Sequence, residues 1–344
     1  MLSDNSVLII ASYAKSLIKF RGDLINALVK RGYSVHVCAP ELVSESETVN
    51  ELVSRGATIH EVSMNRSGLN PIVDVKTFFQ LLRVISSVKP VYVIAYTIKP
   101  VIYGMLSSAL CKIKVPVALI TGLGYAFTEN KGIKRSSVQW LLKVLYRLAL
   151  YNAKVVIFQN KDDCALFCKL ALVEPKKAGV VNGSGVNLSE YSYTPVKDTK
   201  CIKFLLIARL LKDKGILEYV AAARVLRAKY TNVEFGLVGW IDSNPASIAR
   251  AALDEWVHDD IVKYYGHLED VRPALIDSCV YVLPSYREGT PRTVLEAMSI
   301  GRPIITTDVP GCRETVINGK NGYLVPAKSS DALANAMERF VLHP

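Results

Sequence analysis

The stretch Tyr286–Asp308 has the sequence YREGTPRTVLEAMSIGRPIITTD and combines a helix start with an apolar run that predicts a buried strand. Thr290 and Pro291 predict an N-cap hydroxyl followed by a proline at the first helical position. The first amides of a helix have no partner within it and carry the positive end of its dipole. The stretch therefore predicts a binding site for an anion such as a diphosphate, and Gly289 lets that ligand approach the backbone closely.

Two glutamates of this stretch are candidates for contacting the same ligand. Glu288 lies just before the expected helix and Glu296 lies two turns into it. This separation favours contacts with different ends of one elongated ligand over a close acid/base pair. A glutamate on a helix is usually only solvated, so the interpretation depends on its neighbours.

A second segment, residues 203–215, supplies two cations for the same anion. Its sequence KFLLIARLLKDKG predicts a buried strand over 203–210 and a helix that starts near Lys214. Arg209 and Lys214 then lie at the carboxyl edge of a sheet, where α/β folds bind ligands. Two cations and a helix terminus can neutralise a leaving diphosphate, and the sequence contains no Asp-x-Asp metal motif, so we expect no metal and no other cofactor.

These two segments together resemble family 4 glycosyltransferases of the GT-B fold, whose signature has two glutamates with seven residues between them and Gly-x-Pro after the first. The resemblance implies that the first glutamate binds the donor sugar, the second binds the ribose of the nucleotide, and the amides between them bind the diphosphate. It implies a nucleobase site in the loops after the second and third strands of the C-terminal domain. The implied catalytic residues are Arg209, Lys214 and Glu288, and the implied donor-binding residues are Gly289, Thr290, Pro291, Arg292, Glu296, Gly239 and His267.

The whole chain alternates expected strands and helices, which predicts an α/β fold with parallel sheets. Strands are expected at 7–12, 34–40, 58–64, 91–97, 115–121 and 154–160, and again from 203, 233, 261, 280 and 303. The segment 182–199, rich in Ser, Gly and Pro, predicts the domain boundary. We therefore expect two Rossmann-like domains with a central cleft: residues 1–190 for the acceptor and residues 191–344 for the nucleotide sugar.

The N-terminal half resembles bacterial enzymes that act on undecaprenyl diphosphate-linked sugars, in particular the N-acetylgalactosaminyltransferases of lipid-linked oligosaccharide assembly. The resemblance lies in Phe20-Arg21, the stretch NRSGLNP at 65–71, Lys99-Pro100 and Gly-Leu-Gly at 122–124. It implies a membrane-bound diphosphate acceptor. The candidate acceptor-binding residues are Lys15, Ser16, Arg21, Arg66, Lys99, Gly122 and Gly124.

The chain departs from the family pattern in three places. The loop after the first expected strand has Ser-Tyr-Ala-Lys-Ser at 12–16 where many members have Gly-Gly, and Lys15 and Ser16 are expected to substitute by charge and hydroxyl. Thr121 stands where many members have histidine, so no histidine-dependent role is transferred. The chain stops soon after an expected helix at 331–340, where relatives continue into a helix that crosses back to the first domain.

The positive charge is concentrated in the first half of the chain. The net charge is +11, and residues 1–195 hold 23 Lys+Arg against 13 Asp+Glu. The segment 131–154 predicts a basic amphipathic helix, with an apolar surface from Trp140 to Ala149 and cations that can meet anionic lipid. The competing interpretation is a core helix with a solvated basic face.

The composition limits the expected cellular location and binding partners of the protein. Seven scattered cysteines indicate a reducing, cytosolic compartment. No apolar run reaches the roughly 18 residues of a membrane span, and the first residues lack a signal-peptide pattern. We expect a cytoplasmic protein, peripheral on the inner face of the cytoplasmic membrane through its basic N-terminal domain. Nucleic acid is excluded as a partner because no zinc-finger or RNA-recognition signature is present.

The predicted function is a retaining, metal-independent glycosyltransferase of bacterial surface polysaccharide or glycan assembly. It would move a hexose or N-acetylhexosamine from a UDP-sugar to a polyprenyl diphosphate-linked saccharide. Two alternatives remain open at this point: a GT-B sugar-nucleotide 2-epimerase, and a non-catalytic scaffold that binds polysaccharide intermediates. An NAD-dependent oxidoreductase is disfavoured because the turn after the first strand lacks Gly-x-Gly-x-x-Gly.

Overall fold

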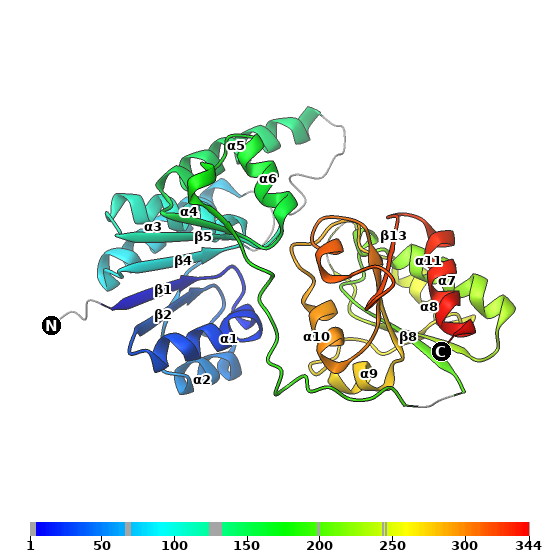
Figure 1. The fold of residues 1–344 in the computed structure, drawn as a ribbon. Helices are drawn as coiled ribbons and strands as arrows, with labels where there is room; N and C mark the ends of the chain where they lie inside the picture. The colour runs from blue at the N-terminus through cyan, green and yellow to red at the C-terminus, as the bar shows by residue number, and fades with distance from the viewer. Residues whose placement is uncertain are drawn as a thin grey trace. The chain divides into compact units, whose positions relative to one another are not determined.

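The computed structural model describes residues 5–65, 70–123, 133–197, 200–242, 244 and 246–343, without the side chains of residues 133–138. The chain divides into two compact units, Met1–Ser184 and Gly185–Pro344. The expected boundary lay between residues 190 and 191, so the structure assigns the segment 185–190 to the second unit rather than the first. Figure 1 shows both units as ribbons.

The first unit is built on one parallel sheet. Its strands are β1 (Ser6–Ile10), β2 (Ser34–Ala39), β3 (Ala57–Glu61), β4 (Tyr92–Tyr96), β5 (Val115–Ile120), β6 (Val155–Phe158) and β7 (Ala178–Val180). Its α-helices are α1 (Lys15–Lys30), α2 (Ser46–Ser54), α3 (Pro71–Val88), α4 (Ile98–Leu110), α5 (Ile133–Asn152) and α6 (Lys161–Lys169). Over the described residues the strand order is β3-β2-β1-β4-β5-β6-β7.

Side chains of β1 alternate between two cores, one on each face of this sheet. Val7 and Ile9 pack in the core that includes residues of α1 and α2. Leu8 and Ile10 pack in the core that includes residues of α3, α4, α5 and α6. Figure 1 shows these two helical layers on opposite sides of the sheet. Because both faces are covered, the central strand β1 is buried along its whole length and is apolar from Val7 to Ile10, as expected for a parallel sheet.

The second unit repeats this plan. Its strands are β8 (Ile202–Ile207), β9 (Val233–Val238), β10 (Lys263–Tyr264), β11 (Val280–Leu283), β12 (Ile304–Thr307) and β13 (Gly322–Val325). Its α-helices are α7 (Ile216–Lys229), α8 (Arg250–His258), α9 (Arg272–Asp277), α10 (Arg292–Ile300) and α11 (Ser330–Leu342). The parallel order β10-β9-β8-β11-β12-β13, in the described residues, is that of a Rossmann fold. The predicted α/β class with two Rossmann-like domains is therefore confirmed.

Short 3-10 helices complete the elements: η2 (Pro175–Lys177), η3 (Lys212–Lys214) and η4 (Arg313–Thr315). Local sequence explains several helix starts. Asn70 caps α3 by accepting from the amides of Ile72 and Val73, and Pro71 is the first helical residue. Among the described residues, no helix is long and apolar enough to cross a membrane.

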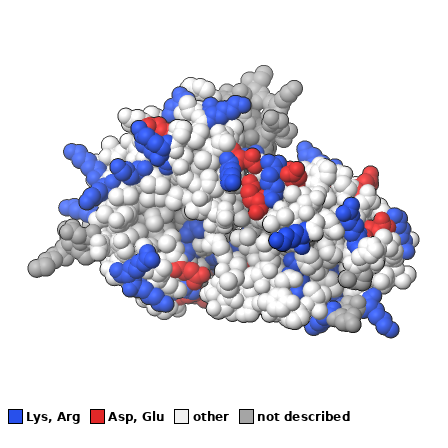
Figure 2. Space-filling view, in the orientation of Figure 1, with Lys and Arg blue, Asp and Glu red and all other residues white. Residues whose placement is uncertain are grey.

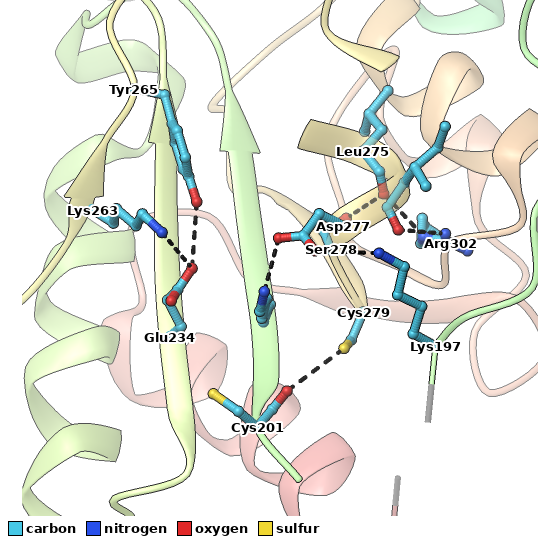
Figure 3. A network of polar contacts seen from close by, with 12 residues as sticks. Lys197, Cys201, Glu234, Lys263, Tyr265, Leu275, Asp277, Ser278, Cys279 and Arg302 are labelled. Carbon is cyan, nitrogen blue, oxygen red and sulfur yellow. Dashed lines mark hydrogen bonds and ion pairs between the residues drawn. The ribbon is translucent and has the colours of Figure 1, made fainter. Parts of the chain in front are cut away.

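The amino edge of the second sheet carries a network of polar contacts (Figure 3). The Nζ atom of Lys203, at the start of β8, lies 2.8 Å from Oδ2 of Asp277, at the end of α9. Lys263 of β10 and Tyr265 both contact Glu234 of β9. Figure 3 shows Lys263 and Tyr265 both directed toward Glu234. These contacts link β8 to α9 and β9 to β10.

A buried arginine anchors the same edge. Arg302 is 2 % exposed and precedes β12. Its guanidinium donates to the carbonyl oxygens of Leu275 and Ile276, at the end of α9, and of Thr194. With a longer contact to the Ile300 carbonyl oxygen, main-chain acceptors therefore compensate for the burial of this cation.

Candidate active site

Four chain segments that carry candidate residues meet at the carboxyl edge of the second sheet. Arg209 follows β8, Gly239 follows β9, His267 follows β10, and the segment 285–291 follows β11. Because neighbouring strands of this sheet are parallel, these loops leave it on the same side. The structure thus brings together the two motifs that the sequence separates by about eighty residues.

Lys214 and Glu288 form the closest contact between the two motifs. The Nζ atom of Lys214 lies 2.5 Å from Oε1 of Glu288, and their side chains are 17 % and 16 % exposed. Ser285 donates its hydroxyl to the same carboxylate oxygen at 2.8 Å. Gly215, with a φ of 72°, allows this approach, because a Cβ at that position would overlap the Pro284 carbonyl group. One carboxylate is therefore held by two donors at the edge of the sheet.

Tyr286 ties the same two loops together, and the sequence reasoning missed it. Its amide donates to the carbonyl oxygen of Asp213 at 2.9 Å, and its hydroxyl donates to Oε1 of Glu218 at 2.6 Å. Burial and the bond to Glu218 raise the pKa of Tyr286. The other carboxylate oxygen of Glu218 is buried and has no hydrogen-bond partner among the described residues. This tether fixes η3, which carries Lys214, against the loop that carries Glu288.

Arg209, the second predicted cation, is paired with a carboxylate that the sequence reasoning did not single out. Its Nη1 atom lies 3.0 Å from Oδ2 of Asp242, and the side chains are 35 % and 21 % exposed. An ion pair with this much solvent exposure is weak. A diphosphate, which carries more negative charge than one carboxylate, can compete with Asp242 for the guanidinium.

The start of α10 differs from the prediction. The helix begins at Arg292 and its N-cap is Pro291, with no side-chain hydrogen bond to the cap. The expected N-cap role of Thr290 and the expected first helical position of Pro291 are therefore wrong by one residue. The physical reason is that Pro291 has an extended ψ of 111°, which places it outside the helix.

Glu296 of α10 belongs to a small group of polar side chains. Its Oε1 atom accepts from Nε of Arg292 at 2.8 Å, and its side chain is 8 % exposed. Tyr191 belongs to the same group: burial, and then the nearby Glu296 carboxylate, raise the pKa of Tyr191 to about 12. The hydroxyl of Ser299 donates to the Tyr191 carbonyl oxygen. The segment before β8 thus packs on the helix that carries Glu296, which no local sequence pattern indicates.

The loops after β9 and β10 contact each other. The amide of Gly239 donates to the carbonyl oxygen of Gly266 at 2.9 Å. Gly239 has a φ of 153°, and a Cβ there would overlap the Ala208 carbonyl oxygen, so this position requires glycine. Trp240 lies edge-to-face with His267 at a centroid distance of 4.9 Å. The Nε2 atom of His267 also lies 3.4 Å from Oε1 of Glu269.

In the first unit, two acceptor candidates gather around Tyr96 at the end of β4. The Oγ atom of Ser16 lies 2.8 Å from the Tyr96 hydroxyl, and the guanidinium of Arg21 lies 4.8 Å from the centre of the Tyr96 ring. Arg21 is only 5 % exposed and also donates to Oγ of Ser184 at 3.1 Å. Arg21 is therefore a buried cation rather than a solvated one.

The other acceptor candidates are less concentrated. Lys99 of α4 forms a 2.7 Å ion pair with Asp74 of α3, and both side chains are about nine-tenths buried. The Nζ atom of Lys15 lies 3.6 Å from Oε2 of Glu45. Gly122 follows β5. Arg66 and Gly124 lie outside the described residues.

Two Rossmann-like sheets in one chain, with cations and a helix start at the carboxyl edge of the second, define the GT-B class of sugar-transfer proteins. Residues 7–160 match the family described as glycosyl transferase 4-like, and residues 202–343 match the glycosyl transferases group 1. The chain belongs to family 4 of the GT-B glycosyltransferases.

Relatives with named activities support this assignment. The chain is 31 % identical over 331 residues to the N,N'-diacetylbacillosaminyl-diphospho-undecaprenol alpha-1,3-N-acetylgalactosaminyltransferase of Campylobacter jejuni, covering 93 % of this chain and 85 % of that protein. It is 27 % identical to the UDP-Gal:alpha-D-GlcNAc-diphosphoundecaprenol alpha-1,3-galactosyltransferase of Escherichia coli, covering 78 % of this chain and 70 % of that protein.

A solved structure supports the fold. The sucrose-phosphate synthase of Thermosynechococcus elongatus matches with a TM-score of 0.76 and 18 % identity. The match covers 99 % of this chain and 90 % of that one. At this identity the likeness supports the two-domain α/β fold alone.

Proposed function

We propose that the protein transfers a hexose or N-acetylhexosamine from a UDP-sugar to a polyprenyl diphosphate-linked saccharide, with retention of anomeric configuration and without a metal. The observation that carries this proposal is the convergence of Arg209, Lys214, Glu288 and the start of α10 at one sheet edge. The named activities of the two relatives supply the substrate classes: both act on undecaprenol diphosphate-linked sugars, and one uses UDP-Gal.

The proposed donor site uses the charges of this edge. The diphosphate of the donor binds the first amides of α10 together with Arg209 and Lys214. Glu288 binds hydroxyl groups of the donor sugar, and Glu296 binds the ribose. Lys214 then contacts both Glu288 and the diphosphate, so it couples the sugar to its leaving group. Such a donor does not need a divalent ion, because the leaving group already meets two cations and a helix terminus.

The proposed reaction exchanges one bond for another on the same face of the sugar. The bond between the anomeric carbon and the diphosphate oxygen breaks, and its electron pair leaves with the UDP. The acceptor hydroxyl forms the new bond from the face that the UDP leaves, and its proton passes to the departing phosphate oxygen. Arg209 and Lys214 stabilise the negative charge that develops on that oxygen.

The test is sugar transfer from a panel of UDP- and GDP-sugars to a synthetic polyprenyl diphosphate-sugar, with and without EDTA. We expect product from one UDP-sugar, unaffected by EDTA, with the donor's anomeric configuration in its NMR spectrum. Glu288→Ala should abolish transfer, and the matched control Glu234→Ala, at the opposite edge of the same sheet, should not. An inverted product, or loss of transfer in EDTA, would contradict the proposed mechanism.

A further inference from the structure

Helix α5 exposes a continuous apolar face. Its exposed members are Trp140 at 67 %, Leu141 at 46 %, Leu148 at 52 % and Tyr151 at 74 %. We call these four residues the α5 outer face. With Val144, which is half-buried, they occupy positions i, i+1, i+4, i+8 and i+11, which share one side of a helix. Large apolar patches of this kind are uncommon on soluble proteins unless they bind something.

The opposite side of α5 packs in the hydrophobic core of the first unit. Tyr146, Ala149 and Leu150 are buried in the core between the helices and the first sheet. Tyr146 packs edge-to-face on Phe167 of α6 at a centroid distance of 5.4 Å. The apolar surface expected from the sequence is thus divided: one side is core, and the outer face has no role in the packing of the described core.

The surroundings of the α5 outer face are basic. Helix α5 contains no Asp or Glu, and residues 133–182 hold nine Lys and Arg against three Asp and Glu. The Nζ atom of Lys177 donates to the Tyr151 carbonyl oxygen at 2.7 Å and lies 5.3 Å from the centre of the Tyr151 ring. Arg147, which precedes Leu148 on α5, donates to the carbonyl oxygens of Leu170 and Ala171. Basic side chains are visible over this part of the first unit in Figure 2.

We propose that the α5 outer face docks on an anionic lipid bilayer. Trp and Tyr prefer the headgroup boundary, where an apolar ring meets water, and Leu141 and Leu148 supply area that enters the acyl region. The surrounding cations attract anionic headgroups. This combination fits a lipid surface better than a second copy of the same chain, because two such faces would bring like charges together. The inference deepens the proposed function, since a polyprenyl-linked acceptor lies in the same bilayer.

The first experiment measures co-sedimentation of the full chain with vesicles of phosphatidylcholine alone or mixed with phosphatidylglycerol. We expect binding to the mixed vesicles that weakens as salt is added. The variant W140S/L148S/Y151S should bind at least about tenfold more weakly, because three exposed apolar groups are lost. The control V43S/V53S removes two side chains, 82 % and 57 % exposed, near the helical layer on the opposite side of the sheet, and should bind normally.

Circular dichroism establishes that both variants are folded, which is expected because all the replaced side chains are exposed. Equal vesicle binding by the wild type and the triple variant would overturn the proposal. A dimer in solution that the triple variant dissociates, together with no vesicle binding by either protein, would also overturn it and assign the face to self-association.

A second readout separates this proposal from the proposed function. With a short-chain acceptor that is soluble in water, the triple variant should transfer sugar at the wild-type rate. With the acceptor embedded in vesicles, it should transfer more slowly. If neither protein transfers sugar to any acceptor, the proposed function fails, and the vesicle-binding comparison still decides the lipid proposal.

Discussion

The two edges of the second unit's sheet carry lysine–carboxylate pairs of the same type in different surroundings. At the carboxyl edge, Lys214 and Glu288 are less than one-fifth exposed and lie among the loops that follow β8 and β11. At the amino edge, Lys203 and Asp277 are 28 % and 46 % exposed and join a strand to a helix. The difference teaches that an ion pair indicates function through its place in the fold rather than through its residue types, since the exposed pair of Lys203 and Asp277 joins two elements and contributes little to stability.

The strongest test of this contrast is Lys214→Ala. Loss of one cation from the leaving group should lower turnover by at least ~100-fold, while the chain stays folded with a lowered thermal unfolding midpoint, because Glu288 keeps the Ser285 donor but loses its cation. Sugar-transfer rates and circular dichroism melting measure the two effects. The matched control is Lys203→Ala at the amino edge, which should retain turnover. Similar losses in the two variants would remove the distinction between the edges.

The second test reverses the expectation at the amino edge. Arg302→Met should lower the free energy of unfolding by about 2–3 kcal/mol, because the main-chain carbonyls that accept from Arg302 lose a buried charged donor. Turnover per folded molecule should stay close to that of the wild type. Urea unfolding measures the first quantity, and transfer normalised to folded protein measures the second. A variant that is stable but inactive would mean that this edge also contributes to catalysis.

A smaller effect is expected from the tether beside Lys214. Tyr286→Phe removes the hydroxyl that donates to Glu218, and it should lower the free energy of unfolding by about 1 kcal/mol. It should also raise the KM for the donor, because η3 is then held less firmly against the loop of Glu288. The control is Tyr230→Phe, which removes a tyrosine hydroxyl that donates to Glu338 on α11. Donor KM values that rise equally in both variants would argue against a positioning role for Tyr286.

The smallest effect concerns polar groups within the first sheet. Nδ1 of His36 and Nε2 of His60 lie 3.0 Å apart on β2 and β3, and burial lowers the pKa of both rings from the usual 6.5. The unfolded chain therefore binds more protons below pH 6.5, and stability should fall as the pH drops below that value. Urea unfolding across this range should show a slope that His36→Gln reduces. A slope that is the same in wild type and variant would exclude the pair as its source.

Much of the fold follows from the sequence because the strands are apolar runs buried on both faces. Expected strand positions such as 34–40 and 115–121 agree with β2 and β5 to within one residue. The edge strands β7 and β13 were missed. They are only three and four residues long and contain glycine, so they lack the apolar run that marks the central strands.

The candidate site could be predicted only in part. Local glycine, proline and charge patterns, together with the resemblance to family 4, singled out Glu288, Arg209 and Lys214 as candidates. Asp242, the partner of Arg209, comes from another segment, and so do two other contacts of the site. Glu218 accepts from Tyr286, and Tyr191 lies near Glu296; these contacts depend on how strands and loops pack. The roles of the predicted site residues in binding and turnover remain predictions for the variants above.

The segment between Gly185 and β8 decides where two related enzymes should be joined to make a hybrid. Tyr191 and Thr194 precede β8, yet the Tyr191 carbonyl accepts from Ser299 of α10, and the Thr194 amide donates to the Ile300 carbonyl oxygen. A graft that began at β8 would leave α10, which carries Glu296, against a foreign neighbour. A hybrid enzyme that keeps its own donor preference should therefore be joined at Gly185, so that the helix and the segment that supports it travel together.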